Sequence, residues 1–329
     1  MNKNELFISV IIPTYNCKNY LVYSLPAIRK SDFPSFELII VDNHSTDGSR
    51  ELAEKYADTV LELDEKWSPG RARNRGAQAS RGSILFFIDA DVQVGQDTIS
   101  LAVKTLEENP ATAAVFGSYD EEPFFHNFFS QYKNLLHHFI HQNADIEART
   151  FWSGCGAIKK EIFFEMDGFP ENYLFPSIED VELGYKLSEN GKKIRLLKEL
   201  QVTHLKKWDF FSLLKSDILC RAIPWTKLAF KKGLPYDLNF KLSHRISGII
   251  VFMLFLCFIL MWRYSFLLLP TIGLAGILFY LNRDLYRFFW EKRGIKFTVP
   301  AIFLHWLYFL YSSVTFGLFF VSSLFKSQK

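Results

Sequence analysis

Short apolar runs alternate with amphipathic stretches over the first ninety residues. Four runs rich in Ile, Val, Leu and Phe predict buried strands at 7–12, 37–41, 59–63 and 84–88. The stretches between them have helical spacing at 19–30, 47–56 and 70–80. Strands alternating with helices predict an α/β fold with a parallel sheet, in which ligands bind beyond the carboxyl ends of the strands. We therefore expect one crevice to hold residues 13–16, 42–47 and 89–91.

The pattern becomes mixed between residues 113 and 197. It predicts a strand at 113–117, a helix rich in Phe and His at 124–141, and two short helices around Glu161 and Asp180. On the predicted helix 124–141, only His137 and His141 of its four histidines share a face, and no Cys or carboxylate cluster accompanies them. We interpret all four, including His126 and His138, as an exposed or interfacial face and not as zinc ligands.

The C-terminal third has the pattern of a membrane-associated region. Residues 205–245 interleave Lys and Arg with Trp, Phe and Leu at helical spacing, which predicts amphipathic helices on an anionic lipid surface, with an ordinary surface helix as the alternative. Three segments that lack Asp, Glu, Lys and Arg predict transmembrane helices at 246–262, 264–282 and 297–325. In the alternative, the first two form a re-entrant hairpin, or Pro270 and Pro300 break these segments.

The charged residues between these segments predict an orientation. Residues 283–296 carry five basic and two acidic side chains, so this loop should be cytoplasmic. Arg263 and the C-terminal tail should then lie outside, and the N-terminal domain inside. We expect a multi-pass protein of the cytoplasmic membrane whose catalytic domain faces the cytoplasm.

Composition and charge support this division. The 329 residues are 49% hydrophobic, which excludes a disordered chain. The net charge of +3 combines −12 over residues 1–191, +9 over 192–245 and +6 over 246–329. A nucleic-acid-binding protein would carry its positive charge on the folded domain. We predict a globular domain at 1–204, basic interfacial helices at 205–245 and a transmembrane region at 246–329.

Cysteine usage and the N-terminus agree with a cytoplasmic domain. The four cysteines lie far apart without a C-x-x-C pair, so neither a zinc site nor a disulfide framework is indicated. Residues 1–7 include no long apolar stretch, and no cleavable signal peptide is expected.

The most specific chemical feature is Asp89-Ala90-Asp91, directly after the strand predicted at 84–88. Two carboxylates separated by one residue can point into one crevice where the backbone turns, and they supply the hard oxygen ligands that Mg²⁺ or Mn²⁺ prefers. Such an ion would neutralise a diphosphate. A solvated turn is the alternative for a D-x-D sequence.

Five ordered segments resemble the family 2 glycosyltransferases: VIIPTYN (10–16), IIVDNHSTDGS (39–49), GRARNRGAQASRGSILFFIDADV (70–92), SGCGAIKKEIFFEMDGF (153–169) and IEDVELGYKL (178–187). The resemblance covers residues 7–205, nearly two thirds of the chain. It implies the GT-A fold, a nucleotide-sugar donor, a divalent metal and inversion at the anomeric carbon. The C-terminal apolar segments lie outside it.

The resemblance also implies roles at the nucleotide end of the site. Pro13, Thr14 and Tyr15 match the loop along the nucleoside, and Asp42 matches the carboxylate that recognises the base, typically uracil. Arg73, in the A-R-N element, matches a residue that faces the nucleotide and its phosphates. Alternatively, Asp42 caps a helix, as we prefer for Asp47, and the arginines at 71, 73 and 75 form a solvated face.

The remaining matches concern the metal, the sugar and the acceptor. Asp89 and Asp91 are the implied metal ligands, with Asp89 and Ala90 beside the donor. His204 matches a histidine near the metal or diphosphate, with a structural role as the alternative. The floor of the donor-sugar and acceptor site is matched by Trp152, Gly154, Cys155 and Gly156.

Glu179-Asp180 matches the acidic pair that supplies the catalytic base, and we assign the base to Asp180. An inverting transfer needs one carboxylate to take the proton of the acceptor hydroxyl. The metal and arginines stabilise the leaving group, so no second protein acid is required. The alternative is negative charge at the start of a short helix, and both roles can coexist.

One departure from the family pattern bears on the product. Processive members carry Q-x-x-R-W after the acidic pair, whereas residues 218–222 read Ile-Leu-Cys-Arg-Ala. Single-sugar transfer from a nucleotide-sugar, with a UDP-sugar favoured, to a lipid-linked or glycolipid acceptor is therefore preferred, as in cell-envelope glycan synthesis. The alternatives are a processive polysaccharide synthase subunit, a sugar-phosphate nucleotidyltransferase and a non-catalytic membrane scaffold.

Overall fold

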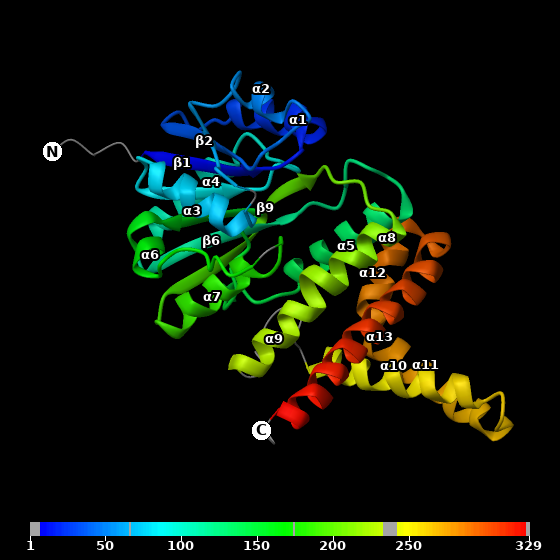
Figure 1. The fold of residues 1–329 in the computed structure, drawn as a ribbon. Helices are drawn as coiled ribbons and strands as arrows, with labels where there is room; N and C mark the ends of the chain where they lie inside the picture. The colour runs from blue at the N-terminus through cyan, green and yellow to red at the C-terminus, as the bar shows by residue number, and fades with distance from the viewer. Residues whose placement is uncertain (1–6, 66, 174, 233–241, 327–329) are drawn as a thin grey trace. The chain divides into compact units, whose positions relative to one another are not determined.

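The computed structural model describes residues 7–65, 67–173, 175–232 and 242–326 (Figure 1). The chain forms two compact units, Met1–Trp208 and Asp209–Lys329. The first unit is an α/β domain whose described strands are β1 (Ile8–Thr14), β2 (Phe36–Asp42), β3 (Thr59–Glu62), β4 (Ile84–Ile88), β5 (Val92–Gln93), β6 (Thr112–Tyr119), β7 (Glu147–Ala148), β8 (Cys155–Lys159) and β9 (Lys193–His204). Its described helices are α1 (Lys18–Arg29), α2 (Ser49–Ala53), α3 (Pro69–Ala79), α4 (Thr98–Glu108), α5 (Phe128–Gln142), α6 (Lys160–Glu165) and α7 (Glu179–Glu189).

The strands form one mixed sheet in the order β3-β2-β1-β4-β8-β6-β9-β5, with β7 also paired to β9. The first four run parallel, as predicted from their alternation with helices. Beyond β4 the sheet changes character, because β8 is inserted antiparallel between β4 and β6. Strand β9 then returns parallel to β6. The α/β fold class is confirmed, although, of the described strands beyond β4 in the sheet, the sequence pattern predicted only β6.

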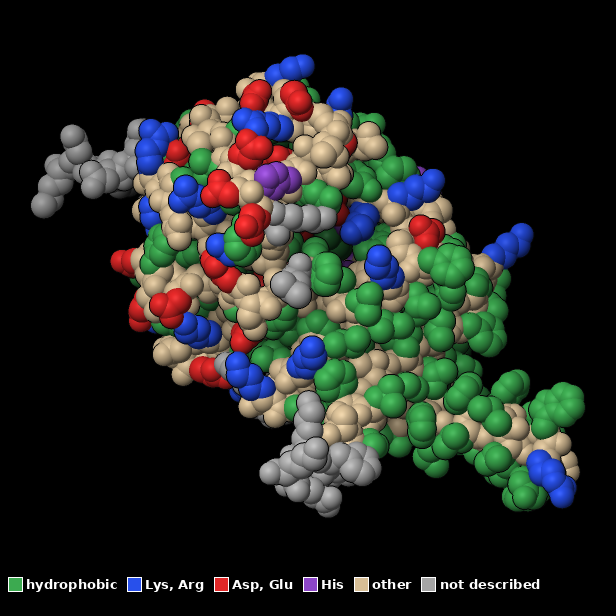
Figure 2. Space-filling view, in the orientation of Figure 1, with side chains coloured by type: hydrophobic (Ala, Val, Ile, Leu, Met, Phe, Trp, Pro, Cys, Tyr) green, Lys and Arg blue, Asp and Glu red, His purple; other side chains and the backbone are tan. Residues whose placement is uncertain are grey.

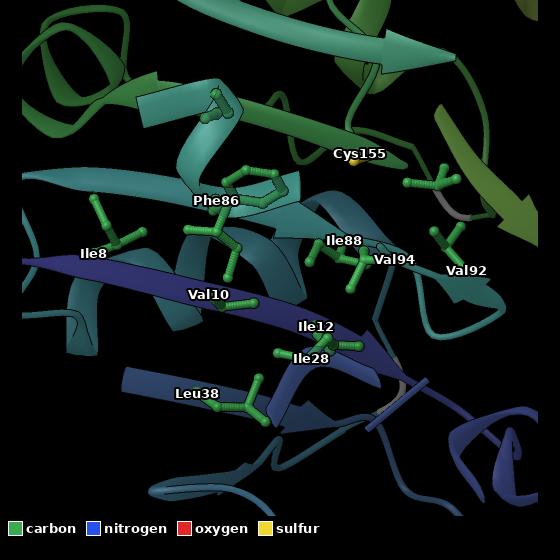
Figure 3. Close-up of a cluster of buried hydrophobic side chains, with 14 of the residues drawn as sticks. Ile8, Val10, Ile12, Ile28, Leu38, Phe86, Ile88, Val92, Val94 and Cys155 are labelled. Carbon is green, nitrogen blue, oxygen red and sulfur yellow. The ribbon is translucent and has the colours of Figure 1, made fainter. Parts of the chain in front are cut away.

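The alternation of side chains along the strands builds a core on each face of the sheet. Ile8, Val10 and Ile12 of β1 pack with Leu21, Leu25 and Ile28 of α1 on one face, together with α4 (Figure 3). On the other face, a Cβ at Gly76 of α3 would lie 2.5 Å from Ile11 Cγ2, so this helix sits tightly on β1. Each fully buried Ile, Leu or Phe contributes about 1.5–3 kcal/mol. This core holds the ends of β1, β2 and β4 at one edge.

The second unit begins with short helices and continues with long apolar ones. Asp209 caps α8 (Phe210–Asp217) by accepting from Ser212 N, and a π-helical turn, η1 (Ile218–Ala222), leads into α9 (Ile223–Lys232). The rest of the predicted interfacial stretch, 233–241, lies outside the described residues. The helices that follow are α10 (Leu242–Leu260), η2 (Ser265–Leu267), α11 (Leu268–Leu281), α12 (Arg283–Arg293) and α13 (Ile295–Lys326).

Within the described chain, two helices are long and apolar enough to cross a membrane, namely α10 and the segment Ile295–Ser322 of α13. The segment Ser265–Leu281 is followed by a 70° bend into α12, and the count is three only if that bent pair is one span. The loop predicted at 283–296 is therefore mostly the helix α12. Hydrophobic side chains cover the surface of the α10–α11 hairpin in Figure 2, and Trp262 at its turn is 94% exposed. Such a surface fits a lipid environment better than water.

Candidate active site

The candidate site lies at the edge of the sheet where β1, β2 and β4 end. Thr14 is paired with Asp42 in the register of β1 and β2, which places the ends of these strands side by side. Asp89 and Asp91 follow β4, and His204 is paired with Val92 across β9 and β5. The predicted crevice residues thus share one edge of the sheet, as expected for parallel strands.

Two buried polar atoms lie at the ends of β1 and β2. Asp42 is 1% exposed; its Oδ2 accepts from Ser45 N at 3.0 Å, whereas its Oδ1 has no hydrogen-bond partner among the described residues. The hydroxyl of Thr14 is likewise buried and, as far as the structure describes the chain, unpartnered. A buried unsatisfied polar group costs about 1–3 kcal/mol. A ligand that donates to Asp42 would remove that cost.

The loops after β1 and β2 support each other around these atoms. Asn16 and His44 adopt left-handed φ values of 49° and 62°. The Asn16 side chain accepts from Thr46 N at 2.8 Å. Asp47 accepts from Lys18 N at the start of α1 and from Ser49 N at the start of α2, so the preferred capping interpretation of Asp47 is confirmed. Pro13 is partly buried in β1, and Tyr15 is 41% exposed beyond it.

The two carboxylates of the D-x-D sequence have different partners. Asp89 Oδ1 lies 2.5 Å from Arg73 Nη2, and Asp89 N donates to the carbonyl of Gly154 at 3.1 Å. Asp91 Oδ2 lies 3.8 Å from His204 Nε2. Burial alone would raise the pKa of Asp91, but His204 and Lys206 outweigh it and hold the pKa at about 2. Ala90, between them, is buried.

The side chains around Asp91 could hold a cation that takes most of its ligands from phosphate oxygens and water. Among the residues that the structure describes, no group of three or more His, Cys, Asp and Glu side chains could hold a metal ion by itself. Mg²⁺ characteristically binds one or two protein carboxylates and completes its shell with phosphate oxygens and water. Asp91 offers an ionised carboxylate oxygen to such an ion, and the neighbouring His204 offers an imidazole nitrogen. Asp89 is instead engaged by a guanidinium.

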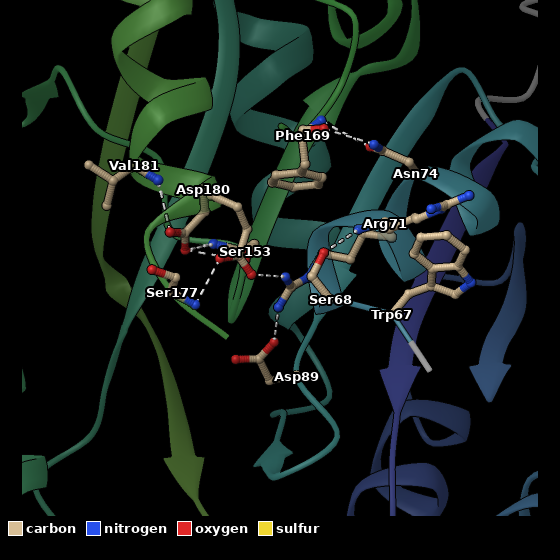
Figure 4. Close-up of polar contacts among 12 residues, drawn as sticks. Trp67, Ser68, Arg71, Asn74, Asp89, Ser153, Phe169, Ser177, Asp180 and Val181 are labelled. Carbon is tan, nitrogen blue, oxygen red and sulfur yellow. Dashed lines mark hydrogen bonds and ion pairs between the residues drawn. The ribbon is translucent and has the colours of Figure 1, made fainter. Parts of the chain in front are cut away.

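The acidic pair is at the start of α7, and Figure 4 shows Asp180 beside Ser153. Glu179 is buried, with Oε1 3.2 Å from Arg73 Nη1 and Oε2 accepting from Ser177 N. Asp180 Oδ2 accepts from both the amide and the hydroxyl of Ser153, at 3.0 and 3.2 Å. Burial raises the pKa of both carboxyls despite these bonds and the nearby guanidinium. A carboxylate of raised pKa is suited to accept a proton near neutral pH.

An aromatic cluster lies beside the acids. The Trp152 ring contacts Tyr119 and His137, with both pairs of centroids 4.9 Å apart, and the Tyr119 ring stacks on His204 at 4.3 Å. A Cβ at Gly154 would lie 2.5 Å from the Trp152 ring, so glycine allows this packing. Tyr119 and Ser153 were not assigned from the sequence, although Ser153 lies inside one of the five segments. Strand pairing brings Tyr119 to His204, which composition does not reveal.

The predicted exposed face of histidines is wrong. His138 and His141 are each 5% exposed and contact the carbonyls of Tyr119 and Gly117 in β6 through Nδ1. His137 packs between Tyr119 and Trp152, and only His126 is exposed. His137, His138 and His141 thus form the face of α5 that covers the sheet. The spacing was compatible with either face, and the hydrogen bonds to β6 decide it.

Residues 9–166 match the family model described as Glycosyl transferase family 2. Among curated proteins, 108 residues are 33% identical to the poly(ribitol-phosphate) beta-N-acetylglucosaminyltransferase TarS of Staphylococcus aureus, covering 31% of this chain and 19% of TarS. Over an alignment of 107 residues, the chain is 35% identical to glycosyltransferase AglE of Haloferax volcanii, covering 30% of this chain and 35% of AglE. The chain thus spans only a fraction of the length of these relatives.

Solved structures share the fold at low identity. The structure of S. aureus TarS 1-349 in complex with UDP-GlcNAc has a TM-score of 0.53 at 22% identity, covering 75% of this chain and 67% of that one. The mannosyltransferase PcManGT from Pyrobaculum calidifontis, in complex with GDP-Man and Mn²⁺, has a TM-score of 0.53 at 18% identity and covers 94% and 86%. Together with the family match and the shared sheet edge, these likenesses show that residues 9–166, just under half of the chain, resemble the family 2 glycosyltransferases in a domain of the GT-A fold.

Proposed function

We propose that the protein transfers a single glycosyl group, with inversion, from a nucleoside diphosphate sugar to a hydroxyl of a membrane-associated acceptor. The observation that carries this proposal is that an unpartnered carboxylate oxygen, on Asp42, shares one sheet edge with a carboxylate of raised pKa, on Asp180. The first suits a nucleobase and the second suits a reacting hydroxyl.

Asp42 favours a uridine donor. Uracil presents one ring N–H, and a single buried carboxylate oxygen is a complementary acceptor for it. The hydroxyl of Thr14, in register with Asp42, can bond a neighbouring carbonyl of the base. The TarS structure with UDP-GlcNAc and the PcManGT structure with GDP-Man contain different nucleotides, so the choice rests on this chain's own side chains.

Asp180 then serves as the general base. Its carboxylate takes the proton of the acceptor hydroxyl while the hydroxyl oxygen forms a bond to the anomeric carbon. The bond from that carbon to the diphosphate breaks on the opposite side, and its electron pair leaves with the nucleoside diphosphate. The amide and hydroxyl of Ser153 hold one oxygen of Asp180 in place. The orientation of the base is therefore set before the acceptor arrives.

Asp91 and His204 are the residues that would hold a divalent cation, Mg²⁺ or Mn²⁺. A cation bound there supplies positive charge to the departing diphosphate. Lys206, whose charge already acts on Asp91, adds to the positive potential at this end of the site. The acceptor's membrane association rests on the apolar helices α10 and α13 and on the basic stretch that begins at residue 205.

Nucleotide binding tests the base assignment. We expect calorimetric titration of the full chain in detergent with Mg²⁺ to show UDP binding more tightly than GDP, dTDP or ADP. Asp42→Asn should weaken UDP binding about tenfold, the equivalent of about 1.4 kcal/mol. Glu62→Gln is the matched control, because Glu62 is the register neighbour of Asp42 but is exposed. Equal UDP affinity in Asp42→Asn and the parent protein would refute this assignment.

Product analysis separates the proposed reaction from its alternatives. Membranes that contain the protein should release UDP from a UDP-sugar, by transfer or slow hydrolysis. Release of pyrophosphate from a sugar phosphate and a nucleoside triphosphate would indicate nucleotidyl transfer instead. A scaffold would show neither reaction and no metal-dependent nucleotide binding. A processive enzyme would yield long chains where we expect one added sugar.

A further inference from the structure

Arg73 occupies an unusual place for a residue matched to a phosphate-facing position. Its side chain is 5% exposed, and each terminal nitrogen contacts a carboxylate of the protein itself, Nη1 contacting Glu179 and Nη2 contacting Asp89. The Nε–H of Arg73 is buried without a partner among the described residues. Each terminal nitrogen thus contacts an acid, and the two acids come from different parts of the chain.

Asn74, the residue after Arg73, also connects α3 to the segment that leads into α7. Asn74 donates to the carbonyl of Phe169 at 2.8 Å and accepts from its amide at 2.9 Å, a two-way pairing of a side-chain amide with the backbone. At the start of the same helix, a Cβ on Gly70 would lie 3.2 Å from Glu179 Cγ. Helix α3 thus holds the segment that leads into α7 through two successive side chains and a close approach.

Charge makes the contacts of Arg73 important, because three acidic side chains lie near its guanidinium. Asp89, Glu179 and Asp180 all act on this guanidinium, and Glu179 is 4% exposed. A buried charge left without its partner strongly destabilises a fold. Without Arg73, the buried acids would repel one another, and the two ends of the site would lose their common contact. The Arg73 side chain therefore holds Asp89 and Glu179 together.

We propose that Arg73 is a positioning residue that joins the D-x-D turn to the acidic pair and so fixes the distance between the leaving-group end and the base end of the site. It acts through Asp89 and Glu179 and not as a phosphate ligand. This inference rests on the proposed function. It assigns the A-R-N element, through Arg73 and Asn74, to assembly of the site.

The proposal separates binding from turnover. Arg73→Met should leave the affinity for UDP within threefold of the parent protein and lower kcat at least 100-fold. Arg75→Met is the matched control, because Arg75 is exposed two residues away on the same helix, and it should change neither quantity. A phosphate ligand would behave in the opposite way, with UDP affinity lowered tenfold or more in Arg73→Met. That result would overturn the proposal.

The pH profile gives a second readout that a purely structural role would not move. The charged groups facing Asp180 are Arg73 from α3, Asp89 after β4 and Glu179 beside it. Arg73→Met removes the positive charge that lowers the pKa of Asp180, so it should move the acidic limb of kcat to higher pH. Glu179→Gln, which removes a negative neighbour, should move it to lower pH. Shifts in the same direction, or none in either variant, would refute the positioning role.

Unfolding measurements keep the test independent of catalysis. Arg73→Met and Glu179→Met should each lower the melting temperature, and the double variant should lose less than the sum of the two, because it removes both charges. Strict additivity would contradict the contact. If the parent protein transfers no sugar at all, the proposed function fails, while the melting and UDP-binding results still decide the role of Arg73.

Discussion

At the scale of single residues, the two acids at the start of α7 show how one chain gives adjacent carboxylates different tasks. Glu179 is engaged by Arg73, whereas Asp180 is held by a neutral amide and hydroxyl from Ser153. Burial raises the pKa of both carboxyls, and Arg73 opposes this rise in each. Because Glu179 is tied directly to the guanidinium whereas Asp180 binds only neutral donors, we propose Asp180 and not Glu179 as the base.

A prediction about pH follows from this difference. Burial raises the pKa of Asp180 above its ordinary value, so its carboxyl keeps a proton to a higher pH than an exposed aspartate would. The turnover rate should rise with pH through this raised pKa and then level off, because only the ionised form accepts the proton. Asp180→Asn should lower kcat by about 10²- to 10⁴-fold. Steady-state rates between pH 4 and 9 measure both effects, and near-normal turnover in Asp180→Asn would remove the proposed mechanism.

At the scale of elements, the parallel strands and the helices between them were predictable because each has a distinct periodicity. Strand β8, antiparallel to both of its neighbours, was not, because residues 151–158 contain glycines and small side chains that carry no strand pattern. Pairing of β8 with β4 nevertheless brings Ser153 and Gly154 beside Asp89 and Asp180. The places of the acids at the sheet edge could be predicted from the motifs and the strand ends, whereas the groups that contact them depend on pairings between distant strands.

The packing of Gly154 against Trp152 yields an element-scale prediction. A methyl group at Gly154 would lie 2.5 Å from the indole, so Gly154→Ala should displace the ring and lower the melting temperature by an amount equivalent to about 1–3 kcal/mol. In a Trp152→Leu background the clash is relieved, and the same substitution should cost much less. Thermal unfolding of the four proteins gives the coupling. Equal losses in both backgrounds would show that the close contact is unimportant.

At the scale of the whole molecule, contacts inside the second unit bear on how the chain meets the membrane. Tyr311 of α13 donates to Asp217 of α8 at 2.7 Å, and Phe316 stacks on Phe230 of α9. Farther along, Lys227 lies over the ring of Phe319. The C-terminal half of α13 therefore runs beside helices that carry exposed Lys and Arg, which are costly in the hydrocarbon core. The C-terminal half of α13 and the helices α8 and α9 should therefore lie at the depth of the lipid headgroups.

This arrangement predicts that the C-terminal part of α13 stays on the side of α8 and α9, contrary to the external tail expected from charge counting. In a background with the native cysteines replaced by serine, Ser322→Cys should resist a membrane-impermeant maleimide in intact cells and react after permeabilisation. Asp284→Cys on α12 should behave in the same way. Arg263→Cys, at the turn after α10, should react in intact cells, because the 19 residues of α10 extend about 28 Å, nearly the thickness of a bilayer core. Labelling of Ser322→Cys in intact cells would instead place α13 across the membrane, as its length and composition alone suggest.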